Sequence, residues 1–267
     1  MMILKMKKED LPAFLESAKS WGELWGPATK DGKTSYEKVD SLSQMDLKAT
    51  RTIIPPKKFL YPPKFTMFDF DEEGFVERTG DVPKRILFGL HPCDIHGILI
   101  MDKLFLETYK DPYYAERREK TLLLGHSCIP DDKCMCFATN TDFVAEGFDL
   151  FFTDLKMFYL VWVGSSKGHD LVRMRADLFS RNLDKNDILN YTEYRKWKTA
   201  QFKAKIDLTG MPDIFELGYN SPIWDELGEK CLSCGQCSMV CPTCNCYNVV
   251  DEVDLGTAEG TRDRFWD

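Results

Sequence analysis

The residues most suited to chemistry lie in the segment CLSCGQCSMVCPTCNC, which holds six of the ten cysteines within residues 231–246. Its first four cysteines follow a C-x2-C-x2-C-x3-C-P spacing and are Cys231, Cys234, Cys237 and Cys241. Thiolates two residues apart on a tight loop can approach a compact cluster from several sides, and the proline then turns the chain away. Zinc modules usually place two C-x2-C pairs on either side of a longer loop, which this run does not do. The spacing therefore favours iron–sulfur ligation over zinc or reduced free thiols.

The number of ligands in this run raises a difficulty. In ferredoxins with two clusters, the fourth cysteine of such a run binds the other cluster. The first three cysteines then need a fourth ligand and Cys241 needs three partners, but no second C-x2-C-x2-C run occurs before Asp267. Either Cys241, Cys244 or Cys246 completes a single cluster, or a second motif follows Asp267. Because residues 256–267 end without a capping element, we expect the second arrangement.

A second group of cysteines lies in the middle of the chain and consists of Cys93, Cys128, Cys134 and Cys136. Cys93 and Cys128 each follow a short β-rich run, at residues 84–90 and 120–125. Since ligands gather at the carboxyl ends of parallel strands, we expect these two loops to meet at one edge of a sheet. Four converging thiolates would suit an iron–sulfur cluster or zinc. The alternative is that Cys93 is a small buried apolar residue and the others are surface thiols.

Other motifs for catalysis are missing from the sequence. There is no G-x-S-x-G, no phosphate-binding P-loop and no G-x-G-x-x-G after a strand. His91 and His126 lie beside the cysteine loops, but a histidine at a strand end is more often packed and hydrogen-bonded, so we assign ligation to none. Asp94 is better explained as a cap of the following helix than as a catalytic acid. We therefore expect no substrate acid–base chemistry.

The elements that must position these cysteines alternate between strand and helix. Apolar runs predict strands at residues 84–90, 120–125, 149–153 and 157–163, with helices at about 95–105 and 169–179. This alternation favours an α/β layer with a mainly parallel sheet. We expect a mixed α/β domain over residues 1–220 and a small ferredoxin-like iron–sulfur module, apparently incomplete, over residues 221–267.

The remaining segments have weaker signals. Residues 1–50 have apolar positions at helical spacing and predict mostly helix. Residues 51–70 contain two Pro-Pro pairs and predict an extended arm. Its segment PPKKFLYPPKF, residues 55–65, is either a docking surface or a wrap over the domain's own core. Residues 184–208 predict a surface helix. Ser221 and Pro222 predict the N-cap and first position of a helix that leads to Cys231.

Composition excludes several classes of protein. The chain has 267 residues, with 43 acidic against 35 basic residues and a net charge of -8, which argues against a nucleic-acid-binding role. The N-terminus lacks the apolar region of a secretory signal, and no apolar run approaches the ~20 residues that span a bilayer. We expect a cytoplasmic protein without a membrane span, in which thiols stay reduced and clustered cysteines indicate metal or redox chemistry.

Three stretches together resemble a known family. HPCDIHGILIMDKLF, GHSCIPDDKCMCF and CLSCGQCSMVCPTCNCYNVVDEVD are similar to the iron–sulfur β subunit of cytoplasmic nickel-iron hydrogenases (sulfhydrogenases), a family that includes one of the subunits of anaerobic sulfite reductase. The likeness runs from the proline-rich arm to the C-terminus. It implies a subunit that passes electrons between a flavin- and NAD(P)-binding partner and a catalytic subunit, through a C-terminal ferredoxin-like pair of 4Fe-4S clusters.

Carried onto this sequence, the resemblance assigns Cys231, Cys234, Cys237 and Cys241 to the family's first cluster run. Cys93, Cys128, Cys134 and Cys136 fall in its other cysteine region, where an additional iron–sulfur cluster is expected. The catalytic partner would be of hydrogenase, sulfite reductase or heterodisulfide reductase type. Two rivals remain: a self-contained reductase whose N-terminal cysteine loops form an open, substrate-binding cluster, and a zinc-stabilised interaction module.

Overall fold

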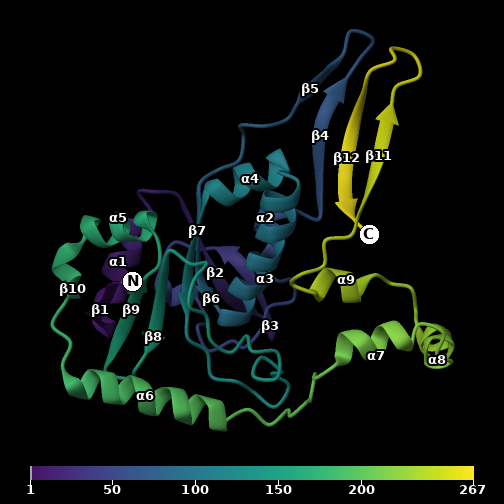
Figure 1. Cartoon of the computed structure of the whole chain (residues 1–267). Coiled ribbons are helices and arrows are strands. Elements are labelled where there is room, and N and C mark those ends of the chain that lie inside the picture. The colour runs from purple at the N-terminus through teal and green to yellow at the C-terminus, as the bar shows by residue number, and fades with distance from the viewer. Residues whose placement is uncertain (1) are drawn as a thin grey trace.

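The structure, a computed structural model, describes residues 2–267, and within them the strands form an eight-stranded sheet and a four-stranded sheet (Figure 1). The larger sheet has the order β10-β1-β9-β8-β7-β6-β2-β3. Its strands are β1 (Met2–Lys7), β2 (Glu23–Lys30), β3 (Lys33–Lys38), β6 (Arg85–Leu90), β7 (Thr121–His126), β8 (Leu150–Asp154), β9 (Phe158–Val163) and β10 (Phe179–Ser180). The neighbours β2, β6, β7 and β8 pair in parallel, and the other pairs are antiparallel. The mixed α/β class is thus confirmed, with the predicted parallel arrangement limited to this central block.

In chain order, the α-helices among residues 2–267 are α1 (Leu11–Ala18), α2 (Lys57–Leu60), α3 (Pro92–Asp102), α4 (Pro112–Glu119), α5 (Ser166–Met174), α6 (Lys185–Ala200), α7 (Met211–Leu217), α8 (Ile223–Lys230) and α9 (Gln236–Val240). Some of these helices cover the two faces of the larger sheet. In β7, Leu122 and Leu124 enter the core under α1 and α5, whereas Leu123 enters the core under α3. Burial on both faces explains why this strand is a continuous apolar run in the sequence.

The smaller sheet projects from the body (Figure 1) and joins distant parts of the chain. Its order is β11-β12-β4-β5, formed by β11 (Tyr247–Val253), β12 (Gly260–Trp266), β4 (Lys64–Phe70) and β5 (Phe75–Glu77). β12 pairs with β4 in antiparallel register, Gly260 opposite Phe70. Residues after 220 are thus held by residues 64–70, and the domain boundary at about residue 220 stays a prediction.

The prediction of a mostly helical N-terminus is wrong. Within residues 2–50 only α1 is an α-helix, and β1, β2 and β3 are strands of the larger sheet. β1 pairs with β9 along its whole length, with Met2 opposite Val163. Such pairing with a distant strand overrides local helical spacing, because strand preference depends mainly on the neighbours a segment packs against.

The proline-rich arm packs on the protein itself. Residues 51–70 are irregular and extended except for the single turn α2, and the strand β4 ends the segment. Phe59, Leu60 and Tyr61 are buried in the core beneath α3. The interpretation of this arm as a wrap over the domain's own core is confirmed, and the docking-surface alternative is wrong for these residues.

The other predicted elements hold with small shifts. The predicted strands correspond to β6, β7, β8 and β9, and the predicted surface helix is α6. α8 starts at Ile223 with Pro222 as its N-cap, one residue later than expected, and it ends directly before Cys231. In the part of the chain from residue 2 onward, every helix is too short or too polar to cross a membrane.

Candidate metal centre

The middle cysteines are brought together by two parallel strands. β6 and β7 are parallel neighbours, so their carboxyl ends lie at the same edge. Cys93 follows β6 and Cys128 follows β7. The predicted loop at His91 is shorter than expected, because Pro92 already starts α3 and places Cys93 in its first turn. The side chain of Asp94 accepts a hydrogen bond from the backbone N–H of His91 at 3.0 Å, which confirms its role at the start of the helix.

All four cysteines of this group line one small cavity of about 10 Å³, together with Lys198, Phe202 and neighbouring loop residues. The predicted convergence of the two strand-end loops is therefore confirmed. Within residues 2–267, however, no three His, Cys, Asp or Glu side chains already stand as metal ligands. The four thiols have the chemistry of a cluster site. Their assignment as ligands stays a prediction.

The loop that carries Cys134 and Cys136 is fixed by polar contacts. Arg51 pairs with Asp131 at 2.6 Å. The backbone N–H of Asp131 donates to Sγ of Cys134 at 3.4 Å, and that thiol donates back to the Asp131 carboxylate at 3.2 Å. These contacts hold the C-x-C pair over the cavity.

The thiols that line this cavity differ in pKa. A hydrogen bond from Cys93 to Cys136 raises the pKa of Cys93, and the same bond lowers the pKa of Cys136 to about 7. Burial raises the pKa of Cys128 to about 11, opposed by the positive charge of Lys198. Cys136 is thus the thiol of this group that most readily becomes a thiolate, the form that binds metal.

Lys198 is a site residue that sequence reasoning missed. It lies on α6, is 7 % exposed, and its Nζ donates to the carbonyl oxygen of Asp142 at 2.9 Å. The helix around it is charged and largely exposed, so its sequence pattern resembled a surface helix throughout. No local signal distinguished this lysine from the exposed Lys196 two residues earlier.

The C-terminal run begins as a tight loop between α8 and α9, continues with Cys237 in α9, and ends after that helix. Ser233 and Gly235 both adopt positive φ, at 51° and 69°, so the chain turns sharply between the first three cysteines. The backbone N–H of Ser233 donates to Sγ of Cys231 at 3.4 Å. Cys231, Cys234 and Cys237 are exposed, whereas Cys241, after α9, is half-buried. A loop with exposed, closely spaced thiols and an N–H directed at sulfur fits the ligand set of an iron–sulfur cluster.

The second half of the run is anchored on α2. Lys57 is 3 % exposed, and its Nζ donates to the carbonyl oxygens of Ser238 at 2.8 Å and of Cys244 at 3.1 Å. The Tyr61 hydroxyl donates to the carbonyl oxygen of Asn245 at 3.1 Å. The proline-rich arm therefore fixes the CPTCNC turn from below, a role that the sequence did not reveal.

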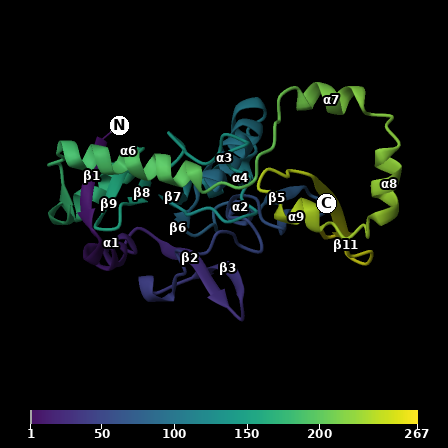
Figure 2. The ribbon, with the colours of Figure 1, turned by 90° about the horizontal axis from the view of Figure 1, so that it is seen from below.

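The two cysteine groups meet at α3. A Cβ atom added at Gly97 would lie only 3.0 Å from Cβ of Pro242, so the Cys-Pro turn packs directly on this glycine. Gly97 follows Cys93 by four residues of the same helix, which is roughly 6 Å of helical rise. α9 lies close to the body in both views, whereas α7 and α8 arch away from it (Figure 2). One helix thus separates the two groups of sulfurs.

Two histidines near the cysteine groups contact the protein's own backbone or aromatic rings. Nε2 of His96 contacts the carbonyl oxygen of Phe143 at 2.8 Å. His126 is buried between Phe88 and Tyr159, and burial lowers its pKa to about 4. Both of its ring nitrogens lack a hydrogen-bond partner among residues 2–267.

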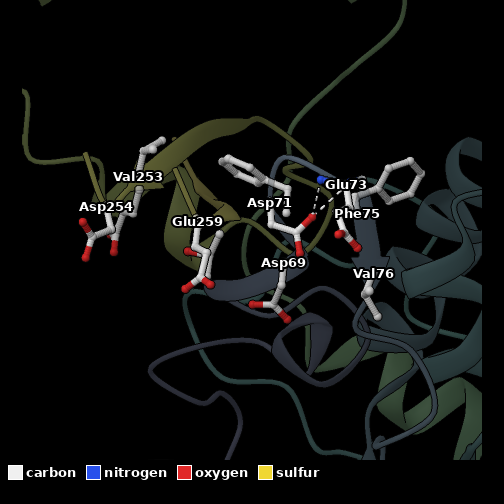
Figure 3. Close-up of a pocket in the computed structure, with 13 residues that line it drawn as sticks. Asp69, Asp71, Glu73, Phe75, Val76, Val253, Asp254 and Glu259 are labelled. Carbon is white, nitrogen blue, oxygen red and sulfur yellow. Dashed lines mark hydrogen bonds between the residues drawn. The ribbon is translucent and has the colours of Figure 1, made fainter. Parts of the chain in front are cut away.

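A much larger cavity, about 840 Å³, lies at the tip of the smaller sheet (Figure 3). Its lining includes the carboxylates of Asp69, Asp71, Glu73, Glu252, Asp254 and Glu259. Asp71 accepts hydrogen bonds from the backbone N–H groups of Glu73 and Gly74, which shape the β4–β5 turn. The lining contains no cysteine, and oxygen donors do not suit an iron–sulfur cluster.

Comparison with known proteins agrees with the chemistry of the cysteines. Residues 230–267 match the family model described as a 4Fe-4S dicluster domain, which makes 4Fe-4S clusters the cofactor of this chain. The chain is also 41 % identical over 251 residues to sulfhydrogenase 2 subunit beta of Pyrococcus furiosus, an alignment covering 94 % of this chain and 75 % of that protein. The chain therefore belongs to the family of iron–sulfur β subunits of hydrogenases and sulfhydrogenases.

Proposed function

We propose that this chain is the electron-transfer subunit of an anaerobic, cytoplasmic oxidoreductase complex. It relays electrons between a flavin- and NAD(P)-binding partner and a catalytic subunit of hydrogenase, sulfite reductase or heterodisulfide reductase type. The observation that carries this proposal is the contact of Pro242 with Gly97 on α3, because it sets the C-terminal cysteine run one helical turn from the middle cysteine group.

Each cysteine group would hold its own cluster. Bound 4Fe-4S clusters supply one-electron transfer, and the protein supplies the thiolates that fix them. In the proposed assignment Cys231, Cys234, Cys237 and Cys241 act within a ferredoxin-like module over residues 221–267. The ligands in the domain over residues 1–220 would be Cys93, Cys128, Cys134 and Cys136. Lys57 and Tyr61 hold the turn of the first group, and Arg51 with Asp131 holds the loop of the second.

The number of thiols at the middle site favours a relay over a self-contained reductase. Four thiols surround the cavity, enough to ligate every iron corner of a 4Fe-4S cluster. A substrate-binding cluster needs an iron site left open and room for the substrate. Four thiolate ligands would occupy all four irons of one cluster and leave none open to a substrate.

The proposal is tested by purifying the native complex without oxygen and identifying its subunits. We expect a flavin-containing and a catalytic subunit to accompany this chain, and reduction of its clusters by NAD(P)H only when the flavin subunit is present. A colourless chain that contains zinc but no iron or sulfide would refute the proposal. So would a chain that alone turns over sulfite or a disulfide.

A further inference from the structure

Each cysteine group has one buried lysine beside it. Lys198 is 7 % exposed and Lys57 is 3 % exposed, although lysine is almost never fully buried without a partner. Among residues 2–267, the ammonium of neither lysine forms an ion pair, and each donates only to backbone carbonyl oxygens. A buried cation without an anion is costly, because its hydration is lost and nothing of opposite charge replaces it.

Lys198 faces the middle group. Its side chain lines the same cavity as Cys93, Cys128 and Cys136. Asp131 pairs with Arg51, and Asp94 accepts from the backbone N–H of His91. Asp142 also lines the cavity, but among residues 2–267 Lys198 contacts its carbonyl oxygen and pairs with no carboxylate. The thiols of the middle group therefore lie beside an ammonium that no carboxylate neutralises.

Lys57 is likewise a buried lysine beside the cysteines of the C-terminal run. Its ammonium bonds to the carbonyls of Ser238 and Cys244, which bracket Cys241 in the chain. On its other side lies the ring of Trp266, with Nζ 4.2 Å from the ring centroid. The aromatic face stabilises the cation but does not neutralise it.

We propose that Lys198 and Lys57 are the charge partners of the two cysteine groups, and that each raises the reduction potential of the cluster in its own group. The inference rests on the proposed function, since it requires a cluster in each group. Thiolate ligation makes a cluster anionic, and reduction adds a further negative charge. A fixed ammonium beside the cluster stabilises the reduced form more than the oxidised form. The two lysines would thus set the order in which the groups accept electrons.

The experiment compares neutral variants with matched lysine controls on the same elements. Lys198→Met is paired with Lys196→Met, an exposed position of α6, and Lys57→Met is paired with Lys58→Met, its neighbour in α2. Iron and acid-labile sulfide are counted first, and redox titrations are then followed by electron paramagnetic resonance. Loss of Cys93 in a separate variant identifies the signal of the middle group.

We expect Lys198→Met to lower the ratio of reduced to oxidised cluster about tenfold at a fixed potential, which is ~59 mV for a one-electron couple. The shift should be confined to the middle group, and that of Lys57→Met to the C-terminal group. Lys198→Gln places a neutral side chain that can still donate to Asp142, and it should lower the reduction potential as much as Lys198→Met does. Lys198→Arg keeps the positive charge and should have the wild-type reduction potential.

The outcomes separate the inference from the proposed function. If wild-type protein contains no iron and sulfide, the proposed function fails. If the neutral variants keep their iron and have the same reduction potentials as the control variants, the clusters are present and the inference about the two lysines is wrong. Restoration of the wild-type potential by Lys198→Gln would also overturn it, because a hydrogen bond and not a charge would then be responsible. Should Lys198→Met lose iron, the Lys57 pair tests the same idea on its own.

Discussion

The contact between Gly97 and Pro242 gives the sharpest prediction. Glycine inside a helix costs about 1 kcal/mol relative to alanine, so a glycine in the middle of α3 needs a reason. The reason is the approach of the Cys-Pro turn: a Cβ at this position would lie 3.0 Å from Cβ and 3.4 Å from the carbonyl oxygen of Pro242. For Gly97→Ala, the gain in helix stability and the mild clash should nearly cancel.

Gly97→Leu should behave differently. It inserts further carbons into a contact already closer than normal packing, which typically costs about 1–3 kcal/mol. The turn relieves this clash by moving away from α3, against the hydrogen bonds from Lys57 and Tyr61 that hold it. With about 1.4 kcal/mol for each factor of ten, the docked turn would lose roughly 5- to 140-fold in population. We expect slower electron exchange between the two cysteine groups, with iron content unchanged.

Freeze-quench spectroscopy after rapid mixing with a reductant measures this exchange. The reductant should reach the exposed cysteine run first, and the signal of the middle group should then rise more slowly in Gly97→Leu than in wild type. Gly228→Leu is the matched control, because a Cβ at Gly228 in α8 would meet nothing within 4 Å. An iron-replete Gly97→Leu protein that equilibrates as fast as wild type would show that this contact does not couple the groups.

Two further predictions concern the run and the smaller sheet. Gly235→Ala should weaken retention of iron by the C-terminal run, because its φ of 69° costs an L-residue ~1–2 kcal/mol; iron counts after dilution check this, with Gly228→Ala unchanged. The hydrogen bonds from Lys64 and Thr66 lower the pKa of the buried Asp263, so its contribution to stability is complete above the unfolded value of about 4 and is lost as the pH falls through the lower native value. Asp263→Asn should therefore be less stable than wild type at pH 7, and the gap in unfolding free energy should close below about pH 4. A gap that widens on acidification would contradict the assignment.

The middle site was predictable because its signals are local. The runs before Cys93 and Cys128 are continuous and apolar, which is typical of strands covered on both faces. The helices after the first run return the chain so that the second strand pairs in parallel with the first, and parallel strands present their carboxyl ends at one edge. The meeting of the two loops therefore follows from the residues of each run alone.

The features that the sequence did not reveal arise from contacts between segments far apart in the chain. β12 joins β4, although residues 71–259 separate the two strands in the sequence, and no spacing within either strand indicates the other. Lys57 lies in a proline-rich arm, and Lys198 lies in a charged helix, so each looked like a solvent-exposed lysine. Their burial follows from segments far away in the sequence, the CPTCNC turn and the loop at Asp142.

The most direct test of the proposed relay is the iron and acid-labile sulfide content of the chain, purified without oxygen, in wild type and in a Cys93→Ser, Cys128→Ser double variant. We expect the double variant to lose about four irons and four sulfides per chain, the content of one 4Fe-4S cluster, while the C-terminal run keeps its signal. An unchanged iron and sulfide content, or zinc in place of iron in the wild-type protein, would contradict the claim that the middle cysteines form a station of an electron relay.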